Sequence, residues 1–194
     1  MRYPWTLGPL FVVACSTHPA SVVDAGSSQQ EALAKQPVAP VAEGLCKPIK
    51  RSLPRPSQGE ASPCGKDVEG IDPGIKAVDY SNRPEQGFAG RTVHRSGQVD
   101  GAHFSGDPQS PMVTEETGCV SAECVRTLWH LAAGLYAEQR LGVVPTSKES
   151  VGYFITVEAE GSPGWVQLPL PPSTPSARAE QISKLIGEMD IGYW

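Results

Sequence analysis

The chain has 194 residues with 16 basic and 21 acidic side chains, which gives a formal net charge of −5 at neutral pH. The acidic surplus lies in residues 75–194 and no basic stripe accompanies it, which argues against a nucleic-acid partner. After residue 14, no stretch approaches the roughly 20 apolar residues that a membrane-spanning helix needs.

The first predicted element is a leader over residues 1–14. It contains one basic residue, Arg2, and an apolar run that ends in Ala14, directly before Cys15. A positive start, a short apolar core and a small residue at the cut are typical of a secretory signal. Because a cysteine follows at once, the chain resembles bacterial lipoproteins. The resemblance implies that Cys15 becomes the first mature residue and carries lipid, with fatty-acyl chains such as palmitate. The alternative is an ordinary signal peptide with Cys15 as a bystander.

Residues 15–74 are predicted to be a flexible linker. No aromatic residue occurs between Phe11 and Tyr80, so this segment lacks the large apolar side chains on which a core depends. We therefore expect a disordered tether that holds a folded domain, residues 75–194, clear of a lipid surface. The basic residues 47–55 are a candidate docking loop, and a solvated linker pinned against the domain is the simpler interpretation.

The cysteine count supports the assignment of Cys15 to lipid. Five cysteines occur, so reserving Cys15 leaves four. In an oxidising compartment four cysteines suggest two disulfides, for which three connectivities exist. We predict the near-neighbour pairing, Cys46 with Cys64 and Cys119 with Cys124. A metal site is a weaker interpretation, because zinc sites normally use tighter spacing and four ligands.

Alternating apolar residues and turn signals predict five strands in the domain. They are expected over residues 75–80, 87–95, 98–104, 151–158 and 165–170. The dipeptide Ser96-Gly97 is the expected tight turn between the second and third strands. Pro169 cannot donate to a ladder, so the last strand is expected to end there or to lie at an edge. The polar residues 105–117 are expected to form a loop.

Two helices complete the domain. The first is expected from the N-cap Ser121 to Arg140, and the second follows the N-cap Thr174 with Pro175 at its first position. The resulting order is β-β-β-α-β-β-α. It predicts an α+β fold in which a small, mainly antiparallel sheet carries both helices on one face.

Catalytic motifs are scarce in the sequence. It contains no G-x-S-x-G elbow and no H-E-x-x-H motif, so we predict a protein that is not an enzyme and that uses no cofactor or metal. The strongest candidate constellation is His94, His103 and Asp100 on neighbouring strands. Histidine pairs bind metals or carry protons. A hydrolase or metal enzyme is therefore the alternative, and it requires that these three side chains converge.

The tetrapeptide Gly87-Phe88-Ala89-Gly90 carries a second resemblance. Together with a central helix, a strand over residues 153–157 and a terminal helix, it makes residues 75–190 similar to emfourin-type inhibitors of thermolysin-like metallopeptidases. Gln86 stands where that motif usually has another glycine. An aromatic residue on a glycine-rich segment is also suited to docking into a partner. Phe88 and the nearby Arg91 are therefore the candidate binding residues.

Together these features predict a non-catalytic lipoprotein of the bacterial cell envelope, held at the membrane by lipid on Cys15. Its acidic domain is expected to bind another exported protein, for example a peptidase. A purely structural envelope component is a further alternative. Ser16 is not the aspartate that retains lipoproteins at the inner membrane in some enterobacteria, which favours the outer membrane.

Overall fold

The computed structural model describes residues 25–57, 59–83, 88–105, 112–144, 152–160, 165–169 and 176–190. The helices in these residues are α1 (Ala25–Lys35), α2 (Ala122–Arg140) and α3 (Ala177–Gly187). The strands are β1 (Lys50–Leu53), β2 (Ile75–Arg83), β3 (Phe88–His94), β4 (Gln98–Ser105), β5 (Met112–Cys119), β6 (Gly152–Ala159) and β7 (Trp165–Pro169). The predicted leader and Cys15 lie outside the described residues.

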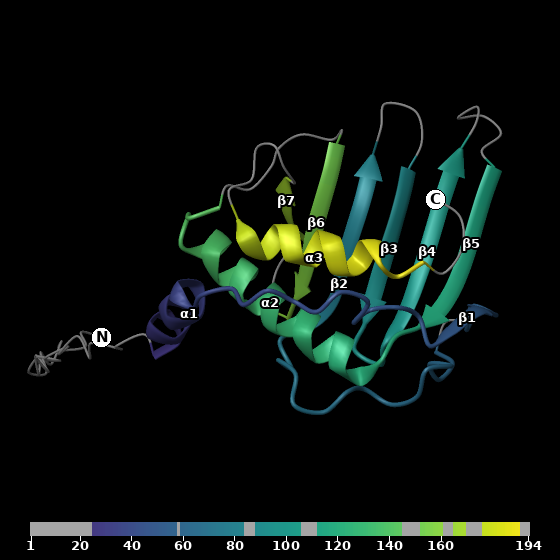
Figure 1. Cartoon of the computed structure of the whole chain (residues 1–194), viewed down its shortest axis with the longest axis horizontal. Coiled ribbons are helices and arrows are strands. Elements are labelled where there is room, and N and C mark those ends of the chain that lie inside the picture. The colour runs from purple at the N-terminus through teal and green to yellow at the C-terminus, as the bar shows by residue number, and fades with distance from the viewer. Residues whose placement is uncertain are drawn as a thin grey trace, which may run out of the picture.

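These seven strands form one sheet in the order β1-β5-β4-β3-β2-β6-β7, and every neighbouring pair is antiparallel. Helices α2 and α3 lie side by side across one face of the sheet (Figure 1). The predicted α+β fold, an antiparallel sheet with two helices on one face, is thereby confirmed. As expected, β7 lies at a sheet edge and ends at Pro169.

The core lies between the sheet and these two helices. Val78, Val93, Val99 and Val157 are cross-strand partners on four strands, and all four are fully buried. Strand residues alternate between the two faces, so this row of valines points toward the helices. The helical residues in the same core include Val125, Leu128, Leu135, Ile182 and Ile186. The apolar stripe of each helix therefore packs against the apolar face of the sheet.

Two boundaries differ from the sequence prediction. The expected loop over residues 105–117 contains most of β5, which pairs with β4 along its length. The sequence did not predict this strand, because β5 lacks the alternating apolar residues that indicate a strand. Its threonines are cross-strand partners of polar β4 residues. The second helix is capped by Ser176, whose side chain accepts a hydrogen bond from the Ala179 amide, so it begins two residues later than predicted. The cap of α2 is Ser121, as predicted.

The segment before residue 75 differs most from its prediction as a linker. Helix α1 packs against α2, and β1 adds an edge strand to β5. Between them, residues 36–45 run as an extended strap along α2 and α3, and Val38, Val41 and Leu45 of this strap pack against the core. Small apolar side chains are sufficient here, because the core they cover is supplied by the rest of the chain. From residue 25 to 57 and from 59 to 74 the chain is therefore part of the folded domain.

All four predicted disulfide cysteines are bonded, but the near-neighbour pairing is wrong. Cys46 pairs with Cys124 and Cys64 with Cys119, and the Cα atoms are 5.1 and 5.5 Å apart. The two bridges are nested, with sequence separations of 78 and 55 residues. Closing loops of this length stabilises a fold by roughly 4 kcal/mol each on the chain-entropy model, more than the short predicted loops would. Both bridges join the N-terminal segment to the β5–α2 corner.

A buried ion pair joins the three helices. Arg178, near the start of α3, pairs with Glu138 of α2, and the two residues are only 5% and 8% exposed. The guanidinium group also donates to the last carbonyl groups of α1 and its continuation, those of Leu33, Ala34 and Gln36. Glu138 accepts a further bond from the Ser176 hydroxyl at 2.8 Å. Arg178 thus caps the C-terminus of α1 from another helix, where a cation suits the helix dipole.

The close approach of Arg178 to α2 requires Gly134. A Cβ added at Gly134 would overlap Nε of Arg178 and lie 2.7 Å from its Cδ. We expect Gly134→Ala to displace Arg178 from Glu138 and to lower the free energy of unfolding by roughly 3 kcal/mol, measured by denaturant unfolding. Gly187→Ala is the matched control, because nothing lies within 4 Å of its added Cβ and stability is expected to be unchanged or slightly higher. Equal effects of the two substitutions would contradict this role for Gly134.

Candidate functional site

The structure brings together two of the three residues of the predicted constellation. Nε2 of His94 lies 2.9 Å from Oδ2 of Asp100. His103 is on the same strand as Asp100 but three positions away, so strand alternation places it on the opposite face. Val99, which points toward the helices, shares its face with His103. The three side chains therefore do not converge, and the geometry that the hydrolase alternative requires is absent.

Asp100 is the centre of a polar network on the sheet face away from the helices. Gln98 donates to both carboxylate oxygens at 3.0 Å, and the Thr117 hydroxyl donates to Oδ1 at 2.8 Å. Burial opposes ionisation of Asp100, but the hydrogen bonds from His94, Gln98 and Thr117 together outweigh it and hold the pKa of Asp100 below its usual range. Both oxygens are thus used to join β3, β4 and β5, which is a structural role.

Metal binding finds no support in the described residues. No group of three or more histidine, cysteine, aspartate or glutamate side chains in these ranges is placed to hold an ion. In the same ranges, no helix is both long and apolar enough to cross a bilayer.

Of the two predicted binding residues, Arg91 is buried. It is 2% exposed, and its Nη1 donates to the Ile186 carbonyl at 2.9 Å at the end of α3. Burial lowers the pKa of Arg91 to about 10, so the side chain still carries its charge at neutral pH. Arg91 therefore joins the sheet to α3 and does not present its charge to a partner. Phe88 begins β3, but its side chain lies outside the described part, so its contact with a partner stays a prediction.

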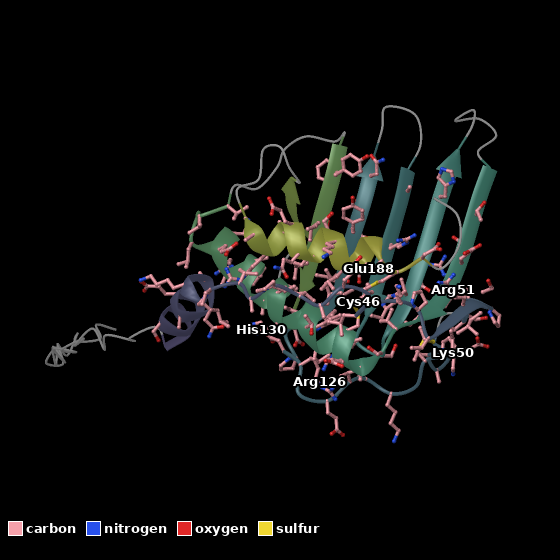
Figure 2. All side chains as sticks on the ribbon, in the orientation of Figure 1. Cys46, Lys50, Arg51, Arg126, His130 and Glu188 are labelled. Atoms are coloured by element: carbon pink, nitrogen blue, oxygen red, sulfur yellow. A yellow bond between two sulfur atoms is a disulfide. The ribbon has the colours of Figure 1, made fainter. Side chains whose placement is uncertain are left out.

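The basic stretch 47–55 lies at the sheet edge, where Lys50 and Arg51 are labelled in Figure 2. Arg51 lies 3.7 Å from Asp190, and Arg55 lies 2.7 Å from Glu115. Two of its charges are thus paired with other parts of the domain. This arrangement favours the interpretation as a pinned segment over a free docking loop.

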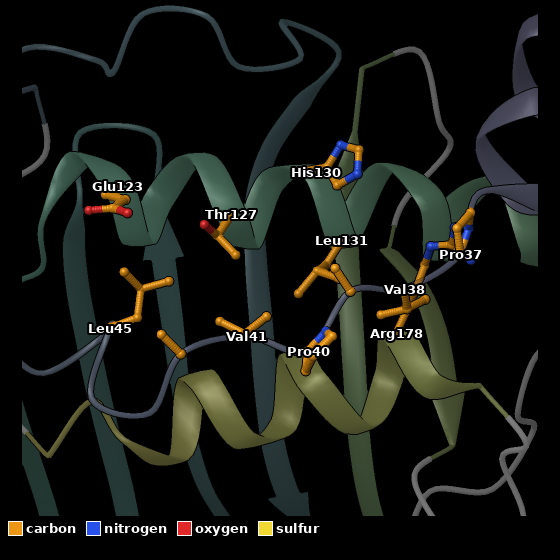
Figure 3. Close-up of a pocket in the computed structure, with 12 residues that line it drawn as sticks. Pro37, Val38, Pro40, Val41, Leu45, Glu123, Thr127, His130, Leu131 and Arg178 are labelled. Atoms are coloured by element: carbon orange, nitrogen blue, oxygen red, sulfur yellow. The ribbon is translucent and has the colours of Figure 1, made fainter.

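A groove of about 310 Å³ lies between the strap and α2 (Figure 3). One wall is formed by the strap, and the other by α2 with Arg178 at one end. The residues that line it are Pro37, Val38, Ala39, Pro40, Val41, Ala42, Leu45, Glu123, Thr127, His130, Leu131 and Arg178. Val41, Leu45 and Leu131 make the floor apolar, whereas Glu123 and His130 are exposed polar groups at the rim. This combination suits an apolar side chain with a polar neighbour.

The strap that forms this groove is fixed at three points. The Val41 amide donates to Oε1 of Gln181 at 3.1 Å, and the Gly44 amide donates to Oε2 of Glu188 at 3.1 Å. Cys46, labelled in Figure 2, then joins the strap to α2 through its disulfide. The groove is therefore held open by fixed backbone on one side and a helix on the other.

Sequence reasoning missed this groove because the strap was assigned to the linker. The available signal was weak. Val38, Val41 and Leu45 recur every three or four residues, and residues 36–42 carry no charged side chain. Such spacing is typical of an apolar face, but prolines at 37 and 40 exclude the helix that would normally explain it.

The role assigned to Asp100 predicts a pH-dependent stability. Both oxygens of Asp100 accept hydrogen bonds, whereas Asn has one acceptor oxygen and a nitrogen that can only donate. We therefore expect Asp100→Asn to lower the free energy of unfolding by about 1–3 kcal/mol at pH 7. Because the folded-state pKa of Asp100 is depressed, its contribution is present above the unfolded-state value and is lost as the pH falls through the folded-state value. The difference between the two proteins should therefore shrink in acid, as measured by denaturant unfolding at several pH values. Asp67→Asn, at an exposed carboxylate, is the control and should change little. A difference that persists in acid would contradict the assignment.

Comparison with known proteins gives no relative from which a role can be transferred. No family model matches the chain, and no curated protein or solved structure is significantly similar to it. The resemblances to bacterial lipoproteins and to emfourin-type inhibitors stay predictions.

Proposed function

We propose that this chain is a lipid-anchored lipoprotein of the bacterial cell envelope whose folded domain binds another exported protein without catalysis. The observation that carries the proposal is the bonding of the cysteines. Four of the five are joined to one another in two disulfides, so no other cysteine of the chain is left to form a disulfide with Cys15. Cys15 is also the residue that directly follows the apolar leader and its terminal small residue, where a lipobox places the acylated cysteine.

The disulfides also support export. They persist in oxidising compartments and are rare where thiols are kept reduced. Both bridges join the N-terminal segment to the domain, and Cys46 and Cys124 are completely buried. A chain that depends on them for its N-terminal packing is suited to the periplasm or the cell surface. Within the envelope we propose the outer membrane, because Ser16 is not the aspartate that retains some lipoproteins at the inner membrane.

Protein binding is supported by the groove between the strap and α2. Its walls are polypeptide held by hydrogen bonds and a disulfide, and its apolar floor accepts one side chain of a partner. The rival hydrolase proposal loses support, because Asp100 and His94 are bonded within the sheet and His103 is on its other face. A purely structural envelope role differs from the proposal in requiring no partner at this groove.

The anchor is tested by replacing its cysteine. The full chain, expressed with its leader in bacteria supplied with labelled palmitate, should incorporate the label and partition into detergent, and Cys15→Ser should do neither. Both proteins should keep a mass change on reduction that reports two disulfides. A double variant, Cys64→Ser with Cys119→Ser, is the control and should still be acylated. An unlabelled wild-type chain, retained in the aqueous phase, would refute the anchor.

The narrower proposal, inhibition of a thermolysin-like peptidase, is tested by adding the purified protein in micromolar excess to such an enzyme. If the glycine-rich segment makes the contact, Phe88→Ala should weaken inhibition by roughly tenfold or more, as expected for a buried aromatic anchor. Thr127→Trp, which fills the groove, should instead weaken inhibition if the groove makes the contact. Ala177→Trp, at an exposed position of α3, is the control for adding a large side chain. Unchanged peptidase activity with the wild-type protein rules out this narrower proposal.

A further inference from the structure

A lipid anchor on Cys15 would be attached by a short connection. This inference rests on the proposed acylation. Only residues 16–24 separate Cys15 from Ala25, where α1 begins. A chain of this length spans at most roughly 35 Å even when fully extended. The expected tether over residues 15–74 is therefore replaced by a connection of nine residues, because α1, the strap and β1 belong to the folded domain.

Such a short connection restricts which surface of the domain meets the lipid. A compact domain of this size is roughly 40 Å across. Helix α1 and strand β1 lie at opposite ends of the domain (Figure 1). If the β1 end faced the lipid, the start of α1 would lie farther from it than the connection reaches. The surface that meets the lipid must therefore lie at or beside the α1 end.

That end carries an exposed apolar turn. Leu141 and Val143, just after α2, are 42% and 61% exposed, and Arg140 beside them is also exposed. The turn is ordered by its backbone, because the Leu141 amide donates to Ala137 at 3.0 Å and the Val143 amide donates to Glu138 at 2.9 Å. Gly142 supplies the positive φ of 71° that the turn requires. The apolar side chains are thus held outward by a fixed backbone.

The turn and the anchored helix are held together. The backbone carbonyl of Glu138 accepts a hydrogen bond from the Val143 amide, and the carboxylate of the same residue pairs with Arg178. Arg178 in turn donates to the carbonyl groups at the end of α1. Leu33 of α1 also lies beside Tyr136 and Ala137 of α2. The end of α1 and the apolar turn therefore belong to one rigid corner of the domain, and the connection to Cys15 leaves from the other end of this eleven-residue helix.

We propose that the turn at residues 140–143 rests on the lipid surface when Cys15 is acylated. Leu141 and Val143 enter the boundary between headgroups and acyl chains, and Arg140 extends to a lipid phosphate. The domain has net negative charge, so the contact depends on the anchor and the apolar pair and is expected with zwitterionic lipid. Two other large apolar residues of the described part are exposed. Ile49, at 65%, precedes β1 at the far end and faces water, and Tyr153 of β6, at 48%, stacks on Tyr80.

The test measures amide hydrogen exchange on the full chain. Because the other four cysteines are bonded, a maleimide reagent attaches at Cys15 alone, and the chain is coupled to phosphatidylcholine vesicles through a maleimide lipid. The reference is the same chain coupled to a maleimide without acyl chains. We expect exchange over residues 139–144 to slow several-fold on vesicles, while residues 47–51 stay unchanged.

A matched pair of variants completes the test. Leu141→Gln with Val143→Gln should abolish the slowing on vesicles, whereas Ile49→Gln should leave it intact. Absence of slowing at residues 139–144, or equal slowing at both ends, overturns the docking proposal. Because the coupling is chemical, this result is independent of whether cells acylate Cys15, which the palmitate experiment decides.

Discussion

The buried guanidinium group of Arg178 is the contact on which the arrangement of the helices depends. It neutralises Glu138 in α2, and it donates hydrogen bonds to carbonyl groups at the end of α1. A buried charge without its partner is costly, so the three groups stabilise the fold only when all are in place. Gly134 makes the arrangement possible, because any side chain there would occupy the space of the guanidinium stem.

The N-terminal segment gains its structure from the domain that it covers. It has no aromatic residue of its own, and its contribution to the core consists mainly of a few aliphatic side chains such as Val38, Val41 and Leu45. Two nested disulfides and the hydrogen bonds to Gln181 and Glu188 compensate for this small apolar area. The consequence for the proposed function is geometric, since a packed segment leaves a short link to the anchor and forms one wall of the groove.

The polar face of the sheet illustrates how a plausible catalytic set becomes a structural one. His94 and Asp100 are in contact, as neighbouring strands of a hairpin allow. Gln98 and Thr117 also donate hydrogen bonds to the carboxylate of Asp100, and His103 lies on the opposite face of the sheet. These hydrogen bonds hold the pKa of Asp100 below its usual range. The groove beside α2 offers better support for a function, because its floor is apolar and its rim polar.

The sequence alone determined the elements whose signals are local. Alternation predicted β2, β3, β4 and β6, and the Ser121 cap with the apolar stripe predicted α2, because these patterns arise from the chain's own geometry. It also determined that four cysteines would pair. Tertiary structure decided which cysteines meet, that the polar β5 is a strand, and that the strap is ordered. Each of these depends on residues far away in the chain: Cys46 meets Cys124, and Arg178 meets α1, only after the sheet and helices have formed the surface that receives them.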